Sequence, residues 1–141
     1  MIYLGMDLGS KTIGLSISDR TATIASSLNV IRYKDYEDLF NQLDPIVYLR
    51  KVDAFVLGNP LNLDGSFSDR CKITNEFKSL LESRYKGIEV IMQDERLSTV
   101  EAQRLLISND ESRKKRKKVV DKIAASIILQ AYLDKRKANE E

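Results

Sequence analysis

The stretch "GMDLGSKTIGLSISD", residues 5–19, decides the fold, because two runs of alternating apolar residues flank a Gly-Ser-Lys connection. Alternation with a period of two predicts β-strands, and so short a connection predicts that the two strands are antiparallel neighbours. Asp7 lies inside the first run, between Met6 and Leu8. A buried strand has no structural need for a carboxylate there, so Asp7 is a candidate functional residue.

One more segment completes this pattern, since three successive strands with short turns predict an antiparallel meander before helices and strands begin to alternate. Pro45 is expected to kink or split the first helix, and Gly87 to end the second. Ser98 and Glu101 have the spacing of a capping box that opens the third helix. The expected strands cover residues 1–9, 12–19, about 21–33, 53–60 and 88–96, and the expected helices cover 35–52, 68–87, 98–109 and 119–137.

This order of elements predicts an α/β fold with three layers. The expected sheet is mixed and five-stranded, an antiparallel meander followed by parallel strands, and helices flank it. The length of 141 residues predicts one domain over residues 1–141. Residues 108–118, which are highly charged and poor in apolar side chains, are expected to be mobile.

The composition excludes several classes of chemistry. The chain has no histidine, which excludes Ser-His-Asp and Cys-His catalysis, so any hydrolysis must depend on carboxylates, lysine or a metal. Its single cysteine, Cys71, cannot form an internal disulfide or a zinc site. No run of about 18 apolar residues is present, and the amino end starts as a strand, so we expect a cytoplasmic protein and no membrane partner.

Positive charge is concentrated in one segment. The net charge is +2, but residues 113–118, "RKKRKK", hold six of the 23 basic residues, which leaves 17 basic against 21 acidic residues elsewhere. Such a run is either a solvated loop or the binding segment for a polyanion, of which nucleic acid is the best candidate. The six residues are Arg113, Lys114, Lys115, Arg116, Lys117 and Lys118.

Four carboxylates lie in the middle of the first strand, at the end of a later strand and at the start of the final helix. They are expected to converge, because parallel α/β sheets usually place their sites at the carboxyl ends of strands and the adjoining helix starts. The four are Asp7, Asp94, Glu95 and Asp121, the last in the expected first turn of the final helix. A cluster of carboxylates is costly unless it binds a cation, and Mg²⁺ or Mn²⁺ in such a site supports phosphodiester hydrolysis without histidine. The alternatives are pairing of Asp7 with Lys11, pairing of Asp94 or Glu95 with Arg96, and interaction of Asp121 with a helix dipole.

Four blocks in order, "GMDLGSKTIGLSISD", "VLGNPLNLDGS", "DERLSTVEA" and "VDKIAASIILQAYLD", resemble the YqgF family over nearly the whole chain. Members of this family are ribonuclease H-like proteins described as Holliday junction resolvases or as nucleases that mature the small-subunit ribosomal RNA precursor. The resemblance implies a ribonuclease H-like fold and a metal-dependent acidic site with Asp7, Glu95 and Asp121 as catalytic residues and metal ligands. Asp94 is the alternate to Glu95, because strand neighbours face opposite sides. Thr12 and Asn59 depart from the family pattern beside the proposed cleft.

The cations nearest these blocks, Lys11 and Arg96, suit phosphate positioning, although Arg96 is equally suited to a structural ion pair. The loop 59–66 either offers Asn59, Asn62 and Ser66 to sugar or phosphate or only shapes a turn. Few aromatic residues lie near the basic run, so we expect recognition of nucleic acid backbone and shape rather than of bases.

Three functions remain open from the sequence. The first is a metal-dependent endonuclease, a hydrolase acting on structured RNA in 5′-end processing of pre-16S rRNA, or on branched DNA as a Holliday junction resolvase in recombination and repair. The second is a non-catalytic RNA-binding assembly factor. The third is a nucleotide-binding ATPase lobe, which Asp-x-Gly-Ser-Lys also resembles, although such ATPases need two lobes. The protein is expected to be a monomer or a homodimer, the latter suiting a two-fold-symmetric DNA junction.

Overall fold

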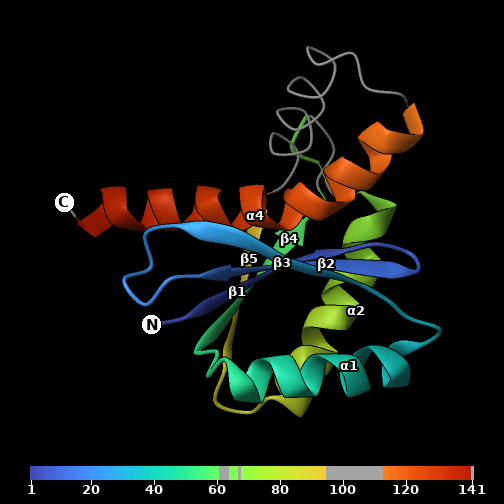
Figure 1. The fold of residues 1–141 in the computed structure, drawn as a ribbon, viewed down its shortest axis with the longest axis horizontal. Coiled ribbons are helices and arrows are strands. Elements are labelled where there is room, and N and C mark those ends of the chain that lie inside the picture. Colours follow the sequence, from blue (N-terminus) through green and yellow to red (C-terminus); the bar gives the residue numbers. More distant parts are fainter. Residues whose placement is uncertain (61–63, 67, 95–112, 141) are drawn as a thin grey trace.

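The computed structural model describes residues 1–60, 64–66, 68–94 and 113–140, with the backbone alone for 113–122 and 140. Its described elements form a mixed sheet covered by helices on both faces (Figure 1). In chain order they are β1 (Tyr3–Leu8), β2 (Thr12–Ser18), β3 (Ala25–Arg32), α1 (Tyr36–Leu49), β4 (Ala54–Asn59), α2 (Asp69–Arg84), β5 (Glu89–Asp94) and α4 (Arg113–Glu140).

The sheet has the strand order β3-β2-β1-β4-β5. β1 pairs antiparallel with β2, and β2 with β3, whereas β1–β4 and β4–β5 are parallel pairs. α4 covers one face of the sheet, and α1 and α2 cover the other (Figure 1). The predicted three-layer α/β fold, with its meander followed by parallel strands, is confirmed.

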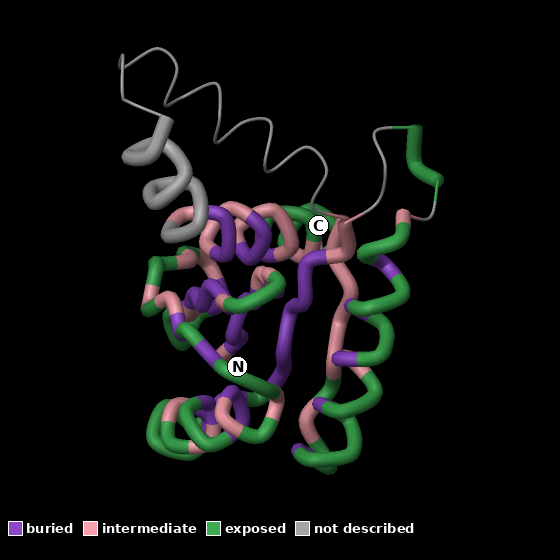
Figure 2. The backbone as a smooth tube through the Cα atoms, turned by 90° about the vertical axis from the view of Figure 1, so that its right-hand side faces the viewer, coloured by how far each residue is buried: buried purple, intermediate pink, exposed green. Residues whose placement is uncertain are grey.

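Each face of the sheet has its own apolar core, because successive strand residues point to opposite sides. Leu4, Met6 and Leu8 of β1 pack in the larger core, under α1 and α2. Tyr3 lies in the smaller core with Leu129 of α4. Figure 2 shows the result, with buried residues along the strands and on the inner sides of the helices, and exposed residues on their outer sides.

α4 lies unusually close to the sheet at Gly5. A Cβ atom on Gly5 would stand 2.2 Å from Ser16 Oγ and 2.8 Å from Leu129 Cβ, so only glycine leaves room for the helix. The Ser16 hydroxyl donates a hydrogen bond to the Ala125 carbonyl at 2.7 Å. Farther along α4, the Gln130 side chain accepts a hydrogen bond from the Ala25 amide at 2.8 Å. The sheet therefore fixes both the distance and the position of α4.

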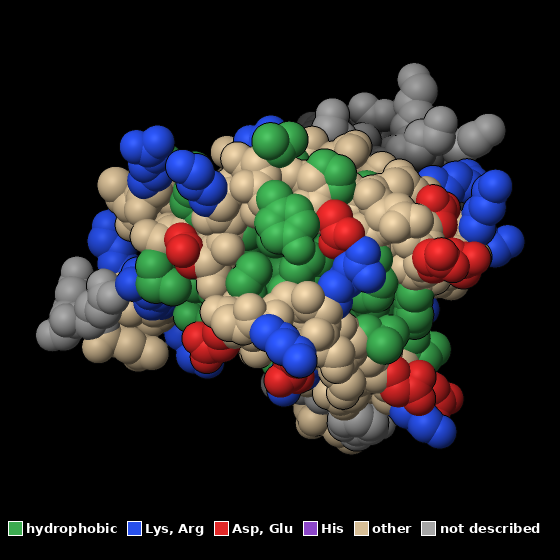
Figure 3. All heavy atoms as spheres, turned by 90° about the horizontal axis from the view of Figure 1, so that it is seen from below, with side chains coloured by type: hydrophobic (Ala, Val, Ile, Leu, Met, Phe, Trp, Pro, Cys, Tyr) green, Lys and Arg blue, Asp and Glu red, His purple; other side chains and the backbone are tan. Residues whose placement is uncertain are grey.

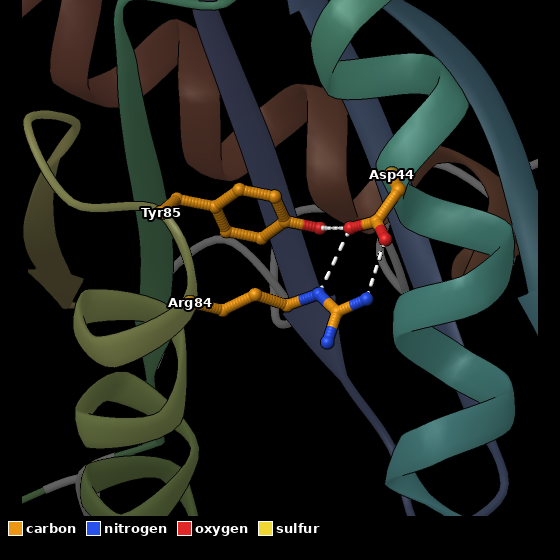
Figure 4. Close-up of polar contacts among 3 residues, drawn as sticks. All are labelled: Asp44, Arg84 and Tyr85. Carbon is orange, nitrogen blue, oxygen red and sulfur yellow. Dashed lines mark hydrogen bonds and ion pairs between the residues drawn. The ribbon is translucent and has the colours of Figure 1, made fainter.

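On the opposite side of the molecule, hydrophobic side chains reach the surface among acidic and basic ones (Figure 3). α1 and α2 are joined there by a polar cluster of Asp44, Arg84 and Tyr85 (Figure 4). Arg84 Nε donates to Asp44 Oδ1 at 2.9 Å, its Nη2 donates to Asp44 Oδ2, and the Tyr85 hydroxyl also donates to Asp44 Oδ1. The hydrogen bonds from Arg84 hold the pKa of Asp44 below its ordinary value, against the opposite effect of desolvation.

The structure corrects the bounds of two expected helices. Pro45 does not split the first helix, since α1 is continuous through it. Pro45 and Asn41, whose carbonyl loses its partner four residues on, are both exposed, so water can satisfy that carbonyl. The final helix begins at Arg113 rather than at 119, because lysine and arginine are good helix formers and no glycine or proline interrupts the basic run.

Three further expectations concern the helices. α2 ends at Arg84, before Gly87, which has a φ of +91° in the following turn. The expected helix over 98–109 lies outside the described residues. Within the part of the chain that the structure describes, no helix combines the length and the apolar character needed to cross a membrane.

The contact at Gly5 predicts a stability effect. Gly5→Ala should lower the free energy of unfolding by about 1–3 kcal/mol, because its Cβ overpacks the α4 contact. Urea unfolding of the two single variants and of the double variant with Ser16→Ala measures this. The cost of Gly5→Ala should be smaller in the Ser16→Ala background, which removes the nearest atom; equal costs in both backgrounds would contradict the crowding explanation.

The Asp44 cluster predicts a pH effect. A carboxylate whose pKa is lowered by folding contributes stability above its unfolded pKa, about 3.9, and this contribution is lost as the pH falls through the lower folded value. Asp44→Asn should therefore lower Tm at pH 7, and the difference from wild type should shrink below about pH 4. Glu82→Gln, which breaks the exposed Lys78–Glu82 pair at 3.8 Å, is the control and should change Tm little. A Tm difference for Asp44→Asn that stays constant down to pH 2 would rule out this linkage.

Candidate functional site at the carboxyl edge of the central strands

Asp7 lies next to the carboxyl end of β1, the central strand, and is the one partly exposed residue of that strand. It follows Tyr3 and Gly5 on the face that α4 covers. Its partner across β2 is Gly14, and the β1–β4 register, which pairs Met6 with Leu57, places Gly58 on its other side. Both neighbours are glycines, so neither adjacent strand places a side chain beside the Asp7 carboxylate.

Asp94 is the last residue of β5, paired with Asn59 of β4. Val90 and Met92 pack against the core under α1 and α2, whereas Ile91 packs against the core under α4. The same alternation assigns Asp94 to the α1–α2 face. The structure thus brings Asp7 and Asp94 to one edge of the sheet but assigns them to opposite faces, while Glu95 lies outside the described residues.

α4 runs antiparallel to β1, so its early turns approach the carboxyl end of that strand. The Tyr3 and Tyr132 rings lie 5.4 Å apart, and a Cβ on Gly5 would meet Ala125 O at 3.0 Å. Continuing this register from Gly5 to Asp7 leads along α4 to the turn before Ala125, where the backbone carries Asp121. Asp121 is therefore not in the first turn of its helix as expected, since α4 begins eight residues earlier, and the dipole alternative, which acts within one turn, does not apply.

The turn between β1 and β2 is held in place by hydrogen bonds from both sides. Gly9 N donates to Thr12 O at 2.7 Å across the turn. Tyr33 donates twice, from its amide to Lys11 O at 3.0 Å and from its hydroxyl to Gly9 O at 2.5 Å. Arg70 of α2 donates from Nη2 to Leu8 O at 2.8 Å. The exposed Lys11 therefore lies on a fixed backbone. Thr12, one of the residues that depart from the family pattern, supplies the carbonyl oxygen that accepts the hydrogen bond across the turn.

Beside this turn lies a hollow of about 340 Å³. It is lined by Gly9, Ser10, Tyr33, Asp35, Tyr36, Arg70 and Ile73, which come from the turn and from the amino ends of α1 and α2. Burial raises the pKa of Tyr33 and of Tyr36, and their mutual interaction raises that of Tyr33 further, so both hydroxyls stay protonated at neutral pH. Sequence reasoning missed Tyr33, Tyr36 and Arg70 because they meet only through contacts distant in the chain.

The loop after β4 favours a structural role for Ser66. Its amide and its hydroxyl both donate to Asp64 Oδ1, at 2.8 and 2.6 Å, which is the pattern of a turn. Asn59 differs, because its side-chain oxygen is buried and has no hydrogen-bond partner among the described residues. Asn62 lies outside the described residues.

The remaining predicted site residues are described only in part. Arg96 lies outside the described residues, and the basic run 113–118 is described as backbone of α4 alone. Among the side chains that the structure describes, no three His, Cys, Asp or Glu residues are close enough to hold a metal ion. Cys71 is buried, in keeping with a packing role.

Comparison with known proteins adds to this geometry. A family model described as "RuvX: Holliday junction resolvase" matches residues 1–135. A protein from Geobacillus sp. (strain WCH70), named "Putative pre-16S rRNA nuclease", is 43% identical over 136 residues, covering 95% of this chain and 98% of its own. A protein of the same name from Staphylococcus haemolyticus is 45% identical over 133 residues, covering 93% and 94%.

Solved structures share the fold at low sequence identity. The Thermus thermophilus RuvC structure in complex with a Holliday junction substrate has a TM-score of 0.55 at 14% identity and covers 97% of this chain and 96% of its own. The fowlpox virus Holliday junction resolvase has a TM-score of 0.55 at 17% identity and covers 96% and 99%. These likenesses agree with the ribonuclease H-like fold expected from the sequence.

Proposed function

We propose, since the chain belongs to the RuvX family of Holliday junction resolvases, that it is a metal-dependent endonuclease that hydrolyses phosphodiester bonds of structured nucleic acid. One observation carries this proposal. The Asp7 carboxylate lies on the central strand between two glycines, on the face covered by the helix that carries Asp121. A carboxylate on a strand flanked by glycines, facing a helix that carries a second carboxylate, is the kind of oxygen donor set that a hard divalent cation binds.

We assign the substrate to the ribosomal precursor, with 5′-end processing of pre-16S rRNA as the role. Relatives more than 40% identical over nearly the whole chain carry the name of such a nuclease, which supports RNA. Cleavage of a four-way DNA junction is the second candidate, supported by the description of the family model. Both substrates present the same phosphodiester, so the 2′-hydroxyl and the groove shape must separate them.

The donor set fits a hard divalent cation, which we propose to be Mg²⁺ or Mn²⁺. The chain has no histidine, its one cysteine is buried, and the proposed ligands Asp7, Glu95 and Asp121 offer oxygen atoms only. When bound, such a cation supplies charge stabilisation and a more acidic bound water. Neither strand beside Asp7 places a side chain next to its carboxylate, and the Ser16–Ala125 hydrogen bond fixes α4, the helix that carries Asp121, against the sheet.

Strand alternation supports Glu95 over Asp94 as the third carboxylate. Along β5 the odd-numbered Ile91 packs toward α4, and the even-numbered Val90 and Met92 pack away from it. Asp7 is on the α4 side, so the ligand from this segment should have an odd number. Asp94 has an even number, so the alternation places it on the face away from α4.

The cations are proposed to hold the phosphate backbone. Lys11 projects from a turn fixed by four hydrogen bonds, which limits the entropy lost on binding. On α4, helical spacing places positions 114, 117 and 118 on the same face as position 121. We propose that these lysines, together with Arg113, Lys115, Arg116 and Arg96, guide the polyanion toward the carboxylates and offset their repulsion.

The catalytic role of Asp7 can be tested with an end-labelled pre-16S rRNA precursor and a four-way DNA junction, in Mg²⁺, Mn²⁺ or chelator. Asp7→Asn should reduce cleavage by more than about 100-fold, because even indirect ligand contacts cost 10- to 100-fold. Glu89→Gln, at the opposite edge of the sheet, is the matched control and should cleave normally. Binding of RNA without cleavage in either metal, unaffected by Asp7→Asn, would instead favour the assembly-factor hypothesis.

The assignment of the third ligand has its own test in the same assay. Glu95→Gln should abolish cleavage as Asp7→Asn does, whereas Asp94→Asn should retain most of it, because Asp94 is assigned to the other face. Cleavage lost in Asp94→Asn and kept in Glu95→Gln would overturn the assignment.

A further inference from the structure

We propose that the hollow beside the β1–β2 turn binds one unpaired nucleotide of the nucleic acid, next to the site of cleavage. The inference deepens the proposed function and rests on it. It assigns the substrate class as nucleic acid with an unpaired nucleotide beside the cut bond. The hollow is separate from the carboxylates, which lie across the edge of the sheet toward α4.

The size and the aromatic lining of the hollow suit a nucleobase. Its volume, about 340 Å³, is within the range of small-molecule sites. The Tyr33 and Tyr36 rings lie 6.1 Å apart, and Tyr36 is supported from behind by Phe77 at 5.5 Å. Ile73 adds an apolar side chain that is 45% exposed. An unpaired base can stack on such a surface whatever its identity, which a paired base cannot.

Arg70 supplies the contact for a phosphate. Its guanidinium donates one hydrogen bond to Leu8 O, which fixes its position and leaves its other N–H groups for a ligand. Within the described residues, Arg70 forms no ion pair with a carboxylate. A fixed and exposed guanidinium that shares the hollow with the Ser10 hydroxyl supplies the charged donor that phosphate binds.

Asp35 places a negative charge on one side of the hollow. One of its carboxylate oxygens caps α1 by accepting from Asp38 N at 2.8 Å. Its charge disfavours a phosphate on that side, while it can accept a hydrogen bond from a base amino group or a ribose hydroxyl. The nucleotide is therefore oriented with its phosphate toward Arg70 and its base toward Tyr36 and Ile73.

The hollow is close enough to Asp7 for one strand to occupy both. Gly9, which lines the hollow, follows Asp7 by two residues, a separation of about 7 Å along a strand. A nucleic acid strand that passes over the β1–β2 turn can place one nucleotide in the hollow and present its neighbouring phosphodiester to the α4 side.

Introducing a negative charge at Ile73 tests the proposal without removing a core residue. Binding of labelled oligonucleotides is measured with the Asp7→Asn protein, so that no cleavage occurs. Ile73→Glu should weaken binding of a strand with an unpaired segment by about 5- to 100-fold, the range for loss of one stacked base, and should leave fully paired duplex within twofold. Leu80→Glu is the matched control, because Leu80 lies on the same helix and is 40% exposed, and should leave both substrates within twofold.

Two neutral variants extend the test. Tyr36→Leu and Arg70→Gln should weaken the same strand, and an abasic nucleotide at the occupied position should weaken wild type but not Tyr36→Leu. Thermal unfolding of each variant confirms folding. Equal loss in Ile73→Glu and Leu80→Glu, or binding within twofold of wild type for all three hollow variants, would overturn the proposal.

A free nucleotide is the other possible source of the same chemistry. Millimolar adenosine or uridine monophosphate should compete only weakly with the labelled strand. The intact strand should bind at much lower concentration, and its binding should depend on Tyr36. Strong competition by the mononucleotide, with no effect of the abasic nucleotide, would overturn the substrate assignment. Because only binding is measured, loss of cleavage activity does not decide the result. A protein that never cuts but shows the Ile73 and abasic effects keeps the hollow and loses the catalytic proposal.

Discussion

The contact between α4 and the sheet at Gly5 is the constraint on which the candidate site depends. Glycine permits the helix to approach, and the Ser16 hydroxyl fixes it by bonding to the Ala125 carbonyl. A helix advances 1.5 Å and turns about 100° per residue, so a slip of one residue would rotate position 121 away from β1. The Gln130 contact to Ala25 holds the same register one turn farther along. The relation between Asp7 and Asp121 is thus set by residues that take no part in the chemistry.

The two faces of the sheet differ in the size and composition of their cores. The α4 face has the smaller core, and the strand residues on both sides of Asp7 are glycines. The α1–α2 face has the larger aromatic core, closed at one end by the Asp44–Arg84 pair and at the other by the bond from Arg70 to Leu8. Since Arg70 and Tyr33 both bond to the β1–β2 turn, the larger core also fixes the backbone that links the two faces.

The sequence predicts the sheet well because strand alternation persists wherever one face is buried, and it reveals Asp7 as a charge that burial does not explain. It fails where local preference and context differ. The basic run suggests a loop by charge, yet its residues favour helix and extend α4 to Arg113. Asp94 and Glu95 are indistinguishable without the strand register. Arg70 and Leu8 are 62 residues apart, and no local sequence pattern predicts their contact.

The β1–β2 turn explains why a single site can suit two substrates. A ribosomal precursor end and a four-way junction differ in sugar and in overall shape, but in both a strand leaves one helix, at an unpaired segment in the precursor and at the crossover into another helix in the junction. A rigid turn with a base-sized hollow on one side and a carboxylate on the other favours a strand that bends across it, because the turn does not have to be ordered on binding. Recognition then depends on the departure of a strand from its helix, which requires no base-specific contact. The proposed specificity is for local shape, and the phosphodiester hydrolysis proposed at Asp7 is the same reaction on RNA and on DNA.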